Sequence, residues 1–133
     1  MKELTEFESL LTKAEDDLDV AQRAIRGKKK IFWVACFHAQ QSAEKYLKAY
    51  LSLQNIAYPK IHDLVEIVQR CEKINAEFTF INGLCQHLNL YAVRIRYSDE
   101  LDLELRDAKK AISAATEIKE FILKKINGKH RRT

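Results

Sequence analysis

Residues 32–51, FWVACFHAQQSAEKYLKAYL, decide the fold class of this 133-residue chain. Small and aromatic side chains recur along this stretch at steps of three and four residues, the spacing of one face of an α-helix. Trp33, Phe37 and Leu51 lie on a neighbouring face, so the first half of the helix is apolar nearly all round. Such a helix packs against more than one neighbour, either at the centre of a bundle or against a second subunit. We expect it to cover about residues 30–54.

Four further segments show the same helical periodicity, at residues 5–25, about 62–73, about 75–96 and 103–126. Gly27 is the expected breaker after the first helix, and Asn75 is the expected N-cap of the fourth. No alternating strand pattern occurs. We therefore predict an all-α fold, an up-and-down four-helix bundle with an additional short helix. The bundle is expected to cover residues 1–127, followed by a basic flexible tail at 128–133.

The composition fits one helical domain and argues against several protein classes. The chain has only three Gly and one Pro, with 47% hydrophobic and 32% charged residues. The N-terminus lacks a signal-peptide layout, and the longest apolar run, IFWVACF, is too short to span a membrane. A soluble, cytoplasmic protein without a membrane partner is expected. Cys36, Cys71 and Cys85 are widely spaced, so we expect buried thiols rather than a disulfide framework.

The charges are unevenly distributed along the chain. Residues 1–25 carry three basic and seven acidic groups, whereas residues 26–50 carry six basic and one acidic group. The basic features are a turn, RGKKK at 26–30, and the tail GKHRRT at 128–133. Runs of this kind are usually solvated surface, and the alternative is attraction of nucleic acid or an acidic partner. The net charge of +4 is too small to identify a nucleic-acid-binding protein by itself.

Two arginines near the end of the fourth helix are the first candidates for chemistry. The stretch LNLYAVRIRYSDE, residues 88–100, contains Arg94 and Arg96 followed by Tyr97. Helical residues two positions apart point about 200° away from each other, so the two arginines cannot serve one face. Arginine suits bidentate binding of phosphate or carboxylate. The alternative is ion pairing with the acidic residues that follow, together with favourable placement at the helix C-terminus.

A polar cluster, HAQQSAEK at 38–45, interrupts the apolar second helix. His38, Gln41 and Lys45 follow one edge, while Gln40 and Glu44 follow an adjacent one. Buried polar groups need partners, so these residues either pin neighbouring helices or line a groove. His62 is likewise either a polar residue at a helix start or part of that groove.

Other kinds of site have no support in the sequence. The four histidines show no i,i+4 pair and no His/Cys cluster, so no metal site is predicted. The glycines are isolated, which argues against a phosphate-binding loop. No Ser or Cys nucleophile has a base placed by a motif, so we predict no catalytic residues and no cofactor.

Three motifs taken together carry a family resemblance over residues 5–126. FWVACFHAQQSAEKYLKAYL, YPKIHDLVEI and YAVRIRYSD, in this order, resemble the HEPN (higher eukaryotes and prokaryotes nucleotide-binding) domain family. The resemblance implies a helical bundle, commonly dimeric, with a groove that handles nucleotide or RNA phosphates. Many members resemble one half of a two-gene, toxin–antitoxin-like system whose other half is a minimal nucleotidyltransferase. Others are metal-independent ribonucleases that carry Arg, four to six residues and then His near the fourth helix.

This chain departs from the ribonuclease pattern because that histidine is missing. The positions four to six residues beyond Arg94 hold Asp99, Glu100 and Leu101, and those beyond Arg96 hold Leu101, Asp102 and Leu103. His87 lies two helical turns before Arg94 on the same face and could substitute in principle.

The residues and the resemblance together predict a non-catalytic protein that binds nucleotide or RNA phosphates. It would form a homodimer and act as partner subunit of a nucleotidyltransferase. The expected phosphate-binding residues are Arg94, Arg96 and Tyr97, and the expected polar groove residues are Gln41, Glu44, His62 and His87. The alternatives are a metal-independent endoribonuclease toxin with a non-standard active site and a helical interaction module whose arginines only tie loops. Trp33, Phe37 and Leu51 are expected to contact the second subunit.

Overall fold

The computed structural model describes residues 3–58, 60, 62–97 and 103–131, and for 93–97 and 129–131 it describes the backbone only. Helices α1 (Glu6–Arg23), α2 (Phe32–Leu53), α3 (Leu64–Ile74), α4 (Asn82–Tyr97) and α5 (Leu105–Arg131) form a bundle, with a 3-10 helix, η1 (Ala76–Ile81), before α4. No strand occurs within these ranges. The predicted all-α bundle with one short helix is confirmed.

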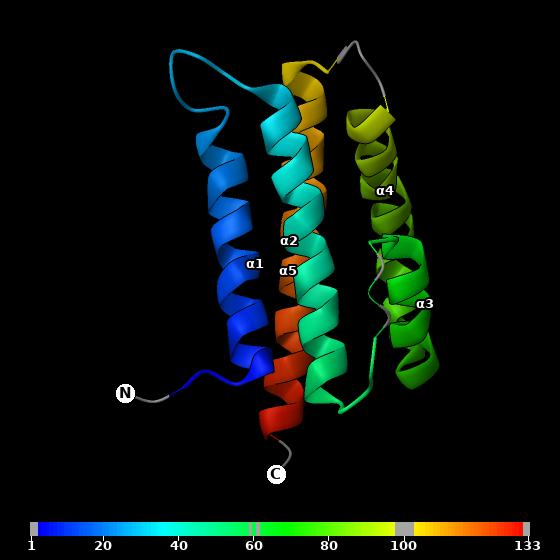
Figure 1. Ribbon diagram of the computed structural model, residues 1–133. Helices are drawn as coiled ribbons and strands as arrows, with labels where there is room; N and C mark the ends of the chain where they lie inside the picture. The colour runs from blue at the N-terminus through cyan, green and yellow to red at the C-terminus, as the bar shows by residue number, and fades with distance from the viewer. Residues whose placement is uncertain (1–2, 59, 61, 98–102, 132–133) are drawn as a thin grey trace.

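Helix α2 is the central element of the bundle. It packs against α1, α3, α4 and α5, and Figure 1 shows it in front of α5, with α1 on one side and α3 and α4 on the other. Its side chains are buried from Ala35 to Leu51 on nearly every face. Leu51 is fully buried inside the chain, so the expectation that it contacts a second subunit is wrong. The near-continuous apolar surface instead reflects a helix with neighbours on several sides.

Alanines and one hydroxyl join α1 to α2. Ala14, Ala21, Ala35 and Ala39 are all fully buried, and such small side chains allow two helices to approach closely. The Ser42 hydroxyl donates to the Ala14 carbonyl at 2.8 Å, which satisfies a polar group that would otherwise be costly to bury.

The ends of the helices differ from the prediction in three places. Helix α1 begins with a capping box between Thr5 and Glu8 and ends at Arg23, before Gly27 is reached. Asn75 is an N-cap as predicted, but the turn that it caps is 3-10 rather than α-helical. Helix α5 continues to Arg131 and so extends into the segment predicted as a tail.

The connection after α2 turns sharply and leads to the residues of interest. Asn55 takes a left-handed backbone conformation with φ 58°, which asparagine tolerates better than most residues. The Ile56 amide then donates to the Leu51 carbonyl at 3.0 Å, which closes the end of the helix. The chain returns along the bundle toward the start of α3, where His62 and Asp63 lie.

Candidate functional site

The start of α3 is fixed by hydrogen bonds from two directions. The Asp63 carboxylate accepts from the amides of Val65, at 2.9 Å, and Glu66, at 3.3 Å. Asn89 of α4 accepts from the Leu64 amide at 3.1 Å and donates to Asp63 at 3.2 Å. A capped N-terminus tied to a neighbouring helix gives a rigid position, and His62 immediately precedes it.

Glu44 is the centre of the candidate site. Its side chain is only 4% exposed, and it accepts from Lys48 Nζ at 3.0 Å. His62 Nδ1 lies 3.1 Å from both Glu44 carboxylate oxygens, and the His62 side chain is 57% exposed. A buried carboxylate is stable only with partners of this kind. The carboxylate thereby fixes the orientation of an imidazole that remains accessible to a ligand.

Neighbouring polar groups support this arrangement. The buried Gln40 amide donates to the His62 carbonyl at 3.3 Å, and Gln41 donates to Gln40 at 2.8 Å. The Lys48 ammonium lies 5.4 Å from the centre of the Tyr58 ring, within range of a cation–π interaction. We call Glu44, Lys48 and His62 the Glu44 cluster.

The chemistry of the Glu44 cluster follows from the hydrogen bond at Nδ1. When Nδ1–H donates to a carboxylate, Nε2 of a neutral ring is left as an acceptor, and a protonated ring has a donor there. Within the described ranges, no hydrogen bond involves His62 Nε2. The cluster can therefore offer an oriented imidazole edge beside an ammonium group, a combination suited to a phosphate or a hydroxyl proton.

The predicted site residues divide into three groups. Gln41, Glu44 and His62 lie together: Gln41 donates to Gln40, Gln40 donates to the His62 carbonyl, and the His62 ring contacts Glu44. His87 lies apart from them, between α4 and α5, where its Nε2 is 3.1 Å from the Tyr91 hydroxyl. Burial, with a smaller effect of Lys110, lowers the pKa of His87. The side chains of Arg94, Arg96 and Tyr97 lie outside the described residues, although the α4 backbone includes all three.

Sequence reasoning missed Lys48 and Asn89. Lys48 follows Glu44 by one helical turn, and this i,i+4 spacing is a signal that could have found it. Asn89 comes from a separate helix, and no local pattern marks its contact with Asp63.

A second polar cluster on α2 ties helices together. Asp17 of α1 is 14% exposed and accepts from His38 Nδ1 at 2.8 Å and from Lys45. The Glu15 carboxylate accepts from the Tyr46 hydroxyl at 2.7 Å and from Lys119 of α5 at 3.0 Å. The edge formed by His38 and Lys45 therefore pins α2 to α1, one of the two roles expected for it.

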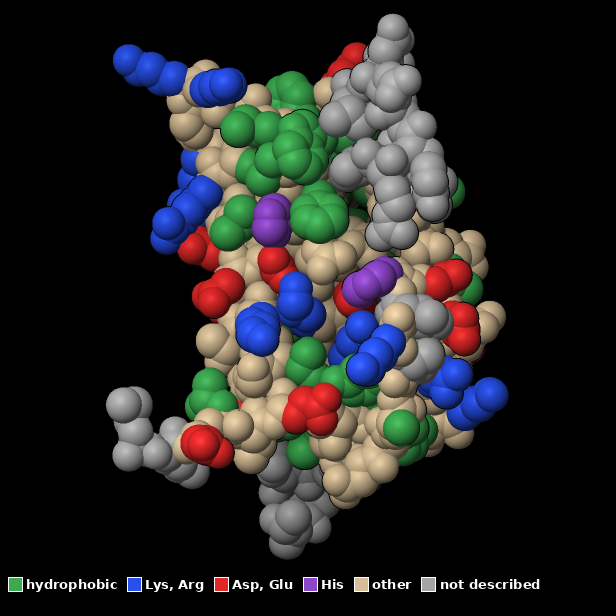
Figure 2. Space-filling view, in the orientation of Figure 1, with side chains coloured by type: hydrophobic (Ala, Val, Ile, Leu, Met, Phe, Trp, Pro, Cys, Tyr) green, Lys and Arg blue, Asp and Glu red, His purple; other side chains and the backbone are tan. Residues whose placement is uncertain are grey.

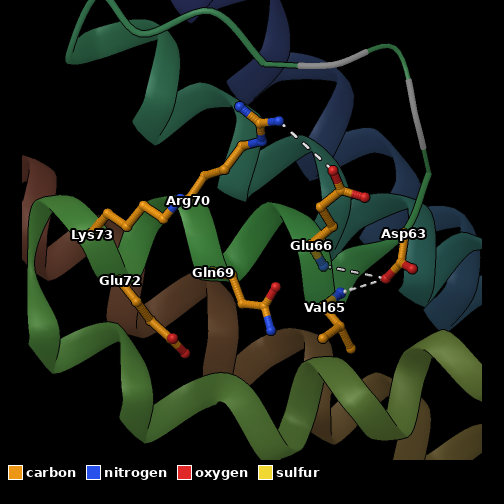
Figure 3. Close-up of a pocket in the computed structure, with 7 residues that line it drawn as sticks. All are labelled: Asp63, Val65, Glu66, Gln69, Arg70, Glu72 and Lys73. Atoms are coloured by element: carbon orange, nitrogen blue, oxygen red, sulfur yellow. Dashed lines mark hydrogen bonds and ion pairs between the residues drawn. The ribbon is translucent and has the colours of Figure 1, made fainter.

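Other parts of the described surface offer weaker candidates. A hollow of about 730 Å³ lies along α3 and is lined by residues between Asp63 and Lys73 (Figure 3). Its side chains point in different directions, and Arg70 pairs with Glu66 of the same helix at 3.7 Å. One helix alone lines it, so we assign it no ligand. The described residues contain no group of three His, Cys, Asp or Glu placed to hold a metal ion.

The comparison with protein families decides the classification. A model of the HEPN domain matches residues 7–126. The chain belongs to the HEPN domain family. Its fold is also similar to that of ST0689, an archaeal HEPN homologue, with a TM-score of 0.74 and 26% sequence identity. The similarity covers 92% of this HEPN chain and 99% of ST0689.

Two further findings complete the comparison. No curated protein matches the sequence of this HEPN chain. Among its described helices, none has both the length and the apolar character needed to cross a bilayer.

Proposed function

We propose that this HEPN protein binds nucleotide or RNA phosphates at the Glu44 cluster. The observation that carries the proposal is the buried Glu44 carboxylate, which orients the exposed His62 ring beside the Lys48 ammonium. Arg94, Arg96 and Tyr97, on the same helix as Asn89, are the proposed additional phosphate contacts. The missing histidine after the arginines favours binding over cleavage.

Binding of a labelled oligoribonucleotide or of an ATP analogue, measured by fluorescence anisotropy, tests this proposal. A hydrogen bond to a charged group contributes about 1.5–3 kcal/mol, so His62→Ala should weaken binding by about 10- to 150-fold. His87→Ala is the matched control, because it removes a histidine between α4 and α5 and should leave affinity unchanged. Equal affinities of the wild type and His62→Ala would reject the Glu44 cluster as the binding site.

We further propose that the protein is the non-catalytic partner of a minimal nucleotidyltransferase in a two-gene, toxin–antitoxin-like system. The family membership and the absence of the arginine–histidine spacing support this role. A small nucleotidyltransferase reading frame next to this gene, and co-purification of the two products, are the expected results. Failure of the two co-expressed proteins to co-purify would argue for a protein that acts alone.

A homodimer is part of the proposal, and the outer surface of η1 and α4 is the region that we assign to it. Phe80 is 82% exposed and Leu90 is 62% exposed. Phe80 lies in η1 and Leu90 lies in the helix that follows it, α4. Two large exposed apolar side chains on consecutive elements favour an interface.

A metal-independent endoribonuclease with a non-standard active site is the second candidate. The Glu44–His62 pair favours it, because a carboxylate-oriented imidazole with an accessible edge is suited to proton transfer. Cleavage of an RNA oligonucleotide in the presence of a chelator, lost in both His62→Ala and Arg96→Ala, would establish this activity. RNA that stays intact with wild-type protein, with Arg96→Ala giving the same result, would reject it.

A further inference from the structure

The N-terminal end of α2 exposes an aromatic surface that the Glu44 cluster does not use. Trp33 is 43% exposed and Ile31 is 36% exposed. Phe37 lies one turn after Trp33 and is half-buried, with its ring 5.2 Å from the His38 ring in an edge-to-face arrangement. Figure 2 shows hydrophobic side chains gathered at this end of the molecule. Because the rest of α2 is largely buried, the exposed apolar side chains at this end form a candidate binding surface.

The loop that precedes this surface carries charge of one sign only. No Asp or Glu occurs between Asp19 and Glu44, and the interval contains Arg23, Arg26, Lys28, Lys29 and Lys30. Arg23 pairs with Asp19 at 2.9 Å. The other four lie in the exposed loop between α1 and α2 and form no ion pair with any described carboxylate. Arg26 and Lys30 donate only to backbone carbonyls, at 3.4 and 3.3 Å.

The positive charge and the exposed aromatic side chains together indicate which kind of partner can bind here. A second copy placed symmetrically on Trp33 would bring two cationic loops together, which is unfavourable. The complementary partner carries flat apolar rings and many negative charges. Single-stranded RNA has both, because its unpaired bases are free to stack on aromatic side chains while its phosphates contact Lys and Arg.

Trp33 and Phe37 lie on the same helix as Glu44 and Lys48 of the Glu44 cluster. Trp33, Phe37, Gln41, Glu44 and Lys48 follow one another at steps of three and four residues. The fifteen residues from Trp33 to Lys48 correspond to about 22 Å along the helix axis. A mononucleotide is too short to reach both ends, whereas a strand of several nucleotides can contact both.

We propose that the exposed N-terminal end of α2 binds single-stranded RNA, with an unpaired base stacked on Trp33 and phosphates bound by the loop at 26–30. This inference rests on the proposed function, since it extends the ligand of the Glu44 cluster from a phosphate group to a strand. Trp33 is the base-binding residue, and the loop lysines supply attraction that does not depend on sequence.

The only tryptophan of the chain gives a direct test by fluorescence. An oligoadenylate of about ten nucleotides should quench Trp33 emission over the same concentrations that raise its own anisotropy. Inorganic polyphosphate, which has charge but no bases, should leave the emission unchanged. Trp33→Ala should weaken oligoadenylate binding by about 5- to 150-fold, since stacking contributes about 1–3 kcal/mol per base. Trp33→Phe should retain most of the affinity.

Two further variants complete the design. Ile74→Ala is the matched control, because Ile74 is 37% exposed and is the last residue of α3, which ends far from the start of α2 (Figure 1). The affinity of this variant should equal that of the wild type. Replacing Lys28, Lys29 and Lys30 by Ser should reduce the slope of log affinity against log salt concentration by about 2.

The outcomes separate this inference from the function on which it rests. Binding that is lost in His62→Ala but unchanged in Trp33→Ala would overturn the stacking inference and leave the proposed function standing. Binding that depends on Trp33 but not on His62 would reject the Glu44 cluster as the binding site and leave the stacking inference standing. Trp33 emission that responds equally to polyphosphate, or that shifts with protein concentration when no RNA is present, would reject base stacking. The second result would assign the surface to another copy of the chain. No RNA binding at all would overturn both proposals.

Discussion

Replacing Glu44 by Gln tests the buried carboxylate without changing its size. The variant keeps the volume of the side chain but removes the charge that partners Lys48 and His62. Breaking a buried ion pair from one side costs about 3–5 kcal/mol. Two features reduce this cost: Lys48, at 11% exposure, keeps its contact with the Tyr58 ring, and water can replace the carboxylate as the partner of the 57% exposed His62. We therefore expect a loss of about 2–3 kcal/mol in the free energy of unfolding.

Urea denaturation at pH 7, followed by circular dichroism, measures this loss. With a urea dependence of about 2 kcal/mol per M, the midpoint should fall by about 1–1.5 M. Adding Lys48→Met should recover part of the stability, because the second change removes the charge that was left without its partner. Glu66→Gln is the control: the Glu66 side chain is 50% exposed and pairs with the 41% exposed Arg70, and an exposed pair contributes less than about 1 kcal/mol. A loss below about 0.5 kcal/mol in Glu44→Gln, or a double variant less stable than either single one, would refute the reasoning.

Three other predictions concern groups outside the Glu44 cluster. The pKa of His87 is lowered in the folded protein, so the unfolded chain binds more protons and stability falls as pH drops below about 6.5. His87→Gln should flatten this part of the profile of melting temperature against pH, and an unchanged profile would contradict the prediction. Leu90→Glu should convert the proposed dimer to a monomer in sedimentation without lowering the helix content, whereas an unchanged mass would assign the interface elsewhere. Burial raises the pKa of the Cys85 thiol to about 12, so alkylation at pH 8 should require unfolding; rapid modification of folded protein would show that the thiol is accessible.

Helical periodicity predicted the fold well because it records burial directly. The alternation of Ala and aromatic residues along α2 identified a helix with neighbours on several sides. Periodicity does not show whether those neighbours belong to one chain or to two. The prediction that Leu51 contacts a second subunit was wrong for this reason. The 3-10 turn after Asn75 was missed because a capping residue is compatible with either type of helix.

The candidate site was predictable only where its residues share a helix or a short motif. Gln41 and Glu44 stood out because they are polar residues in an apolar stretch, and His62 because it precedes a capped helix. The meeting of Glu44 with His62 depends on how the chain turns after α2, and the contact of Asn89 depends on how α4 packs. Those distances are set by tertiary packing, which a single sequence does not encode locally.

The central place of α2 has a consequence for hydrogen exchange and for ligand linkage. A helix in contact with all four other α-helices has no route to open locally, so the amides near its middle should exchange with solvent only when the whole domain unfolds. Trp33 and two members of the Glu44 cluster, Glu44 and Lys48, belong to this helix. A ligand bound there therefore stabilises the whole folded state rather than one loop. RNA binding should slow amide exchange throughout the bundle, including in α5 on the far side of α2 from the bound strand.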